Sequence, residues 1–119
     1  MSALERFAAS LARAGRGMVL KRRVGTGSSF VSATVKGKAT AYQPQELVGG
    51  VIQGDRKVRI AQADLTAAGW PGAAPVGVTA GQWPDRPSKG DSLDGSAVQG
   101  AEALYDGETL VGWKVWVRG

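Results

Sequence analysis

The sequence contains neither cysteine nor histidine among its 119 residues. The absence of cysteine excludes a disulfide framework and a thiolate metal site, and it suits a protein of a reducing compartment or one indifferent to redox state. The absence of histidine removes the commonest general base and the commonest zinc ligand. We therefore expect no catalytic residue, no cofactor and no metal in this chain, and we expect that it is not an enzyme.

Aromatic residues and long apolar runs are also scarce. Aromatic side chains make up 7% of the chain, and no stretch has the length of apolar residues that a membrane helix needs. Arg6 and Arg13 interrupt the apolar segment at the N-terminus, so the pattern predicts no signal peptide. Glycine, in contrast, accounts for 18 residues, which indicates many turns and a small core in a single domain.

The carboxylates are the remaining groups for acid–base chemistry, and most of them lie beside turn glycines. The turn signals are Gly54-Asp55, Gly90-Asp91, Asp94-Gly95 and Asp106-Gly107. Aspartate in such a position usually accepts hydrogen bonds from nearby backbone, so we interpret these residues as turn formers. A carboxylate pair for hydrolysis or metal binding is the less favoured alternative.

Alternation of apolar and polar residues predicts a mainly β protein. After Gly54-Asp55, Val58 and Ile60 face one way while Lys57 and Arg59 face the other, as in a half-buried strand that ends at Ala61. Similar alternation predicts further strands over residues 18–24, 30–42, 97–104 and 110–118. The length of the 30–42 run favours a small antiparallel β-barrel, with a β-sandwich as the alternative.

A short helix is expected from about Ala3 to Ala14, ahead of the strands. Ser2 and Glu5 have the spacing of a capping box, and Gly15 is a natural stop. We divide the chain into an N-terminal helix or arm at 1–16 and one β-barrel domain at 17–119, with extended loops at 43–53 and 66–89. The sequence leaves open whether the helix packs on its own barrel or on a neighbouring subunit.

The two extended loops are the predicted contact surfaces. The first is apolar but contains glycines, and the second holds four of the five prolines and two tryptophans. The tryptophans fit either exposed anchors for a partner or caps over the open end of the barrel. The predicted subunit or partner contacts are Leu47, Val48, Gly49, Gly50, Val51, Ile52, Trp70 and Trp83.

The net charge of +5 is concentrated at the start of the chain, because the first 23 residues hold six of the 15 basic residues and one of the 10 acidic ones. This segment fits either a solvated helix face or a surface facing a polyanion such as DNA. Few aromatics are interleaved with basic residues along the strands, which argues against base stacking. The candidate DNA-facing residues are Arg13, Arg16, Lys21, Arg22, Arg23, Lys57 and Arg59.

The second half of the chain has a recognisable layout of turns and strands. It consists of GVIQGDRKVRI at 50–60, Ala63-Asp64-Leu65, a proline-containing connection, the turn Lys89-Gly90-Asp91, and a final strand that reads GWKVWVRG at 112–119. This layout resembles the head-closure or head–tail joining proteins of the neck of long-tailed double-stranded DNA bacteriophages.

The resemblance implies a structural virion protein without enzymatic activity or cofactor. It implies a homo-oligomeric ring between the portal or adaptor and the tail terminator or tail tube, which closes the DNA-filled head and offers the tail an attachment surface. Assembly in the host cytoplasm, a final place in the virion neck and non-specific contact with packaged DNA follow from the same resemblance. The alternatives are a tail terminator or minor tail protein, and a small cellular barrel that binds nucleic acid through its basic N-terminal segment.

Overall fold

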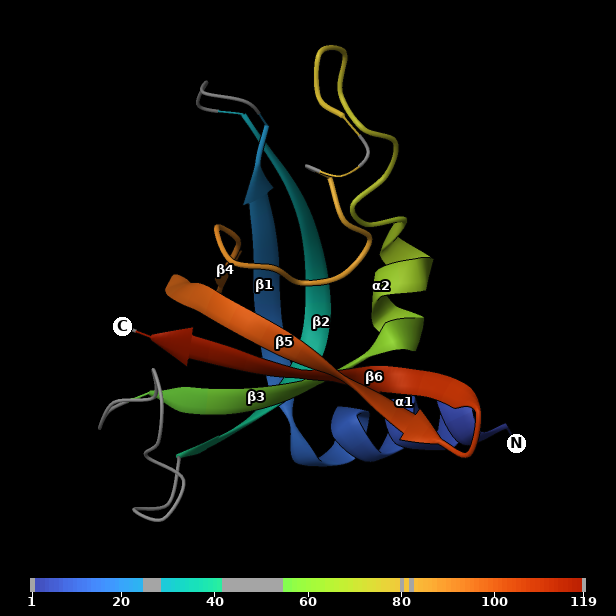
Figure 1. Ribbon diagram of the computed structural model, residues 1–119. Coiled ribbons are helices and arrows are strands. Elements are labelled where there is room, and N and C mark those ends of the chain that lie inside the picture. The colour runs from blue at the N-terminus through green and yellow to red at the C-terminus, as the bar shows by residue number, and fades with distance from the viewer. Residues whose placement is uncertain (1, 25–28, 42–54, 80, 82, 119) are drawn as a thin grey trace.

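The computed structural model describes residues 2–24, 29–41, 55–79, 81 and 83–118. Its strands close into an antiparallel barrel in the order β1-β2-β3-β6-β5-β4 (Figure 1). The mainly β fold and the barrel are therefore confirmed. The elements are α1 (Ala3–Ala14), β1 (Arg16–Arg23), β2 (Phe30–Ala41), β3 (Arg56–Ala61), α2 (Gln62–Ala68), β4 (Ser92–Leu93), β5 (Ser96–Asp106) and β6 (Thr109–Arg118).

The interior of the barrel is filled by apolar side chains from alternate residues of the strands. Leu20, Ile60 and Val115 are fully buried, and each comes from a strand whose alternate residues face outward. Aliphatic side chains fill most of this core. The buried apolar residues of the strands are Met18, Leu20, Ala33, Val35, Val58, Ile60, Ala61, Leu93, Val98, Val111, Trp113, Val115 and Val117.

The long strand β2 is shared between two neighbours, which closes the barrel at a corner. Residues 30–37 pair with β1 and residues 37–41 pair with β3, so Gly37 lies opposite both Arg16 and Ile60. A Cβ atom at Gly37 would lie 2.7 Å from the sulfur of Met18 and 3.0 Å from Cγ1 of Val58, so a side chain there would displace both. Glycine therefore suits the corner, where core side chains of two other strands converge.

The first helix packs on its own barrel. Ser2 caps it by accepting a hydrogen bond from the Glu5 N–H, and Leu11 is buried. Phe7 lies over Gly112 so closely that its ring would collide with a Cβ atom there. Figure 1 shows α1 crossing beneath β6, at the end of the molecule opposite the loop that follows α2. None of the helices in the described ranges is long and apolar enough to span a membrane.

The predicted turns at Asp94-Gly95 and Asp106-Gly107 both connect neighbouring strands. Asp94 and Gly95 have φ values of 52° and 85°, as a two-residue hairpin between β4 and β5 requires. Gly107, with a φ of 64°, turns the chain between β5 and β6. In α2, the carboxylate of Asp64 accepts a 2.9 Å hydrogen bond from the backbone N–H of Lys36. Asp64 thereby continues the β2 hydrogen bonding beyond the end of β3.

Candidate functional site

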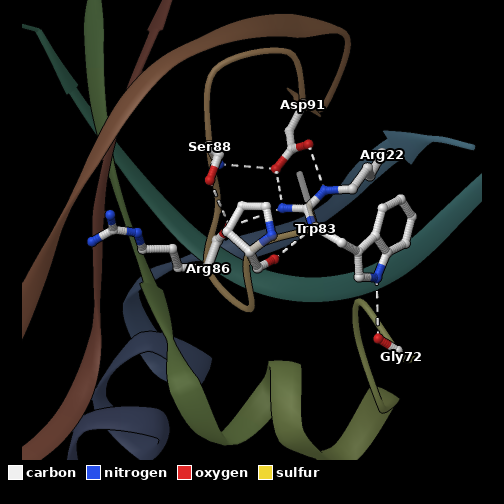
Figure 2. Close-up of polar contacts among 7 residues, drawn as sticks. Arg22, Gly72, Trp83, Arg86, Ser88 and Asp91 are labelled. Carbon is white, nitrogen blue, oxygen red and sulfur yellow. Dashed lines mark hydrogen bonds and ion pairs between the residues drawn. The ribbon is translucent and has the colours of Figure 1, made fainter. Parts of the chain in front are cut away.

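Arg22 lies at the centre of the most connected polar cluster among the described residues. It is 6% exposed, and its guanidinium forms a fork with Asp91: Nε donates to Oδ1 at 2.9 Å and Nη2 to Oδ2 at 3.0 Å (Figure 2). Nη1 donates to the carbonyl of Pro84 at 2.6 Å, and Nη2 also donates to that of Arg86 at 2.9 Å. These bonds join strand β1 to the long connection between α2 and β4.

Two tryptophans complete what we call the Arg22 cluster (Arg22, Trp70, Trp83 and Asp91). The guanidinium carbon lies 4.5 Å from the ring centroid of Trp70 and 5.0 Å from that of Trp83, within cation–π range. The Trp83 Nε1–H donates to the carbonyl of Gly72 at 3.1 Å, as Figure 2 shows. One buried cation therefore holds both ends of the segment that leaves α2 and returns toward β4.

Asp91 also shapes the turn that precedes β4. Its Oδ2 accepts a 2.9 Å hydrogen bond from the Ser88 N–H, and its own N–H donates to the Ser88 carbonyl at 3.0 Å. Gly90 has a φ of 103°, which a residue with a side chain rarely adopts. Asp91 is thus a turn former, as predicted, but it is also the buried counterion of Arg22.

The structure corrects three of the predicted site residues. Arg22 does not face DNA, because it is buried and its donors are used within the protein. Trp70 and Trp83 are 7% and 8% exposed, so they cap the barrel and are not exposed anchors in this chain. The strand parity contained the signal for Arg22, since it places Arg22 on the same face as Met18 and Leu20, where a cation needs a buried partner.

Beyond the Arg22 cluster, the segment 69–79 projects from the barrel as an uncharged loop. Its tip is a turn in which the Val78 N–H donates to the Pro75 carbonyl at 3.0 Å and Gly77 has a φ of 87°. The side chain of Val76 is fully exposed at this tip. Sequence reasoning missed Val76, although Pro75 and Gly77 on either side of it are a turn signal.

An apolar groove lies at the other end of the molecule, between α1 and the β5–β6 hairpin. It has a volume of about 410 Å³ and includes the exposed ring of Tyr105, while Arg6 and Asp106 lie 3.8 Å apart on its rim. In Figure 1 this end of the hairpin lies beside α1, and the 69–79 loop extends in the opposite direction. The groove is lined by Ala3, Arg6, Phe7, Arg59, Leu104, Tyr105, Asp106 and Val111.

The other predicted basic residues do not form one surface. Lys21 and Arg23 are exposed on β1, and Arg59 is exposed on β3 with half-buried Lys57 nearby. Lys21 lies opposite Ser32 of β2 and Arg59 lies opposite Lys38, so roughly 20 Å of strand separates the two groups. The two remaining candidates differ in their partners, because exposed Arg16 pairs with Asp94 at 2.8 Å while exposed Arg13 has no ion pair in the described ranges.

Asp55 is a buried anchor for the last strand, which the turn interpretation did not foresee. It is 2% exposed and accepts hydrogen bonds from Nε and Nη2 of Arg118, each at 2.9 Å, and from Nε1 of Trp116 at 2.7 Å. The hydrogen bond to Asp55 raises the pKa of the Arg118 guanidinium, which keeps it cationic. Trp116 is half-buried in this contact.

The predicted contacts Leu47, Val48, Gly49, Gly50, Val51 and Ile52 lie outside the described residues. Within the described ranges, no group of three or more acidic side chains has the arrangement of a metal site. Comparisons with protein-family models, with curated proteins and with solved structures gave no significant match. The function must therefore be argued from the residues and their geometry.

Proposed function

We propose that this protein is a structural connector of the bacteriophage neck, which assembles into a ring between the portal and the tail and closes the DNA-filled head. The proposal starts from the resemblance in the layout of turns and strands. The observation that carries it is the pair of unlike surfaces at opposite ends of the barrel: the loop with Val76 at its tip, and the groove beside Tyr105.

A ring requires a head-to-tail interface in which one surface of a subunit meets a different surface of the next. Val76 is an aliphatic side chain at the tip of a turn without charged residues, and it has no contact that removes it from water. The side chains of Phe7, Leu104 and Val111 form the apolar part of the groove lining. A second copy of this chain is the occupant that supplies such a tip, so we assign the groove to the loop of a neighbouring subunit.

The Arg22 cluster makes the loop suitable for this role. A flexible segment binds its partner more weakly than a rigid one, because part of the binding free energy is spent on ordering the segment. Here Arg22 bonds the carbonyls of Pro84 and Arg86, and Trp83 bonds that of Gly72, so the base of the loop is held before any partner arrives. The exposed tip is thereby presented at low entropic cost.

The experiment uses two variants that each destroy one surface. Val76→Asp removes the tip, Tyr105→Asp places a charge in the groove, and oligomer size is followed by analytical ultracentrifugation over a wide concentration range. We expect the unaltered protein to form rings at high concentration and each variant alone to stay monomeric. An equimolar mixture of the two variants should form heterodimers and nothing larger, because only one intact tip can meet one intact groove.

Several outcomes would refute this interface. A variant that still forms complete rings would show that its surface is not used, and an interface between identical surfaces would leave one variant dimeric on its own. The virion role is tested separately by removing the gene from its phage, which should leave DNA-filled heads unattached to tails. Co-purification of the protein with free tails, and not with filled heads, would instead favour a tail terminator.

A further inference from the structure

We propose that the outward face of β1 and the start of β2 bind single-stranded nucleic acid, with Phe30 as the stacking platform. The Phe30 side chain is 49% exposed, which is unusual for an aromatic residue in a strand. The ammonium of Lys21 lies 5.8 Å from the centroid of its ring, and the guanidinium carbon of Arg23 lies 5.9 Å from it. The exposed ring of Phe30 therefore lies beside two cationic side chains, Lys21 and Arg23.

The strand register produces this arrangement. Phe30 lies directly opposite Arg23, and Lys21 lies opposite Ser32, two residues further along β2. All of these residues face outward, because Arg22 and Val31 between them have the opposite parity. The sequence places Phe30 seven residues after Arg23, so the juxtaposition is created only when the two strands pair.

The basic residues around Phe30 are available to an anionic ligand. Within the described part of the chain, neither Lys21 nor Arg23 has an ion pair, whereas Arg16 and Arg22 are both paired with aspartates. Arg23 also borders a cavity of about 490 Å³, whose lining includes Lys89 and Trp83. The surface thus offers two cations without an ion pair, Lys21 and Arg23, beside an exposed ring.

This combination selects among polyanions. Phosphates of any nucleic acid can bind Lys21, Arg23 and Lys89, because that attraction does not depend on sequence or on strand pairing. The face of Phe30 is useful only to a planar group that is free to stack on it, and the bases of a duplex are already stacked on each other. A single strand can offer both groups at once, as it does on other small barrels with exposed aromatics.

The test compares fluorescently labelled oligothymidine of about 12 nucleotides with a duplex of the same length, by fluorescence anisotropy at low salt. The Val76→Asp variant serves as the background, so that subunit assembly does not affect the result. Phe30→Ala should weaken binding of the single strand about 5- to 150-fold, since stacking contributes about 1–3 kcal/mol per base. The duplex should bind this variant and the background equally.

The charge variants provide the matching contrast. Arg23→Gln should weaken both ligands and lower the salt dependence for the single strand by about 0.7 in the logarithmic slope. Arg13→Gln, which removes an exposed charge at the other end of the molecule, should change neither ligand comparably, and Phe30→Trp should retain binding. Thermal unfolding confirms that each variant is folded.

Three results would overturn the proposal. The first is absence of single-strand binding at low salt, and the second is a Phe30→Ala variant that binds oligothymidine as well as the background does. The third is equal competition by polyglutamate, which would identify the surface as a general anion site that fits an acidic protein. None of these results bears on ring assembly, which depends on Val76 and Tyr105.

Discussion

Replacement of Arg22 by methionine is the sharpest test of the interior polar cluster. Methionine keeps an unbranched side chain between Trp70 and Trp83 but removes the charge and every N–H that bonds Asp91, Pro84 and Arg86. The carboxylate of Asp91, whose side chain is 4% exposed, would then lack its counterion. Removal of one partner from a buried ion pair typically costs about 3–5 kcal/mol.

That loss is large for a domain of this size, whose total stability is expected to be about 5–15 kcal/mol. With a urea dependence of about 1–3 kcal/mol per molar, the unfolding midpoint of Arg22→Met should fall by about 1–5 M. The midpoint is measured by urea titration with far-UV circular dichroism. Hydrogen exchange of the Val98 amide, which donates to the Asp91 carbonyl, reports whether the segment around Asp91 opens first.

Two further variants make the test specific. Arg23→Met removes the same charge from the exposed face of the same strand, and it should change stability by no more than about 0.5 kcal/mol. Arg22→Met combined with Asp91→Asn should lose about 1–3 kcal/mol less than the sum of the single variants, because the unpaired charge is gone. If Arg22→Met costs less than about 1 kcal/mol, or no more than Arg23→Met, the buried ion pair does not hold the loop to the barrel.

The remaining predictions concern the last strand and the first helix. Asp55→Asn should destabilise the protein by about 1–3 kcal/mol in urea unfolding, because two buried acceptors for Arg118 are weakened, whereas Asp106→Asn at the exposed hairpin should have almost no effect. An Asp55→Asn variant as stable as Asp106→Asn would contradict the anchoring role. Gly112→Ala should cost about 1–3 kcal/mol in thermal unfolding, because its methyl group would meet both the Ile60 carbonyl and the Phe7 ring. Gly17→Ala, which has open space around it, is the control, and equal stability of the two would show that neither α1 nor the Ile60 carbonyl lies close to Gly112.

Local signals in the sequence determined much of the fold. Ser2 and Glu5 begin the first helix and Gly15 ends it, because end effects act within a few residues along the chain. The alternation around Val58 and Ile60 predicted which face of that strand is buried, and the aspartate–glycine pairs predicted the hairpins. Each of these features is decided by neighbours in the sequence, so sequence periodicity and turn chemistry were sufficient.

Only the tertiary structure decided which distant residues meet. Arg22 and Asp91 are 69 positions apart. Strand parity places Arg22 on the apolar face, a signal that the prediction of a DNA-facing Arg22 overlooked, and it does not indicate the counterion. The same holds for the cations around Phe30, which come together through the register of β1 and β2. Trp70 and Trp83 fitted either a surface or an interior role until the barrel provided a buried cation between them. Sequence periodicity predicts on which face of a strand a side chain lies, whereas the residues that it contacts depend on how the whole barrel closes.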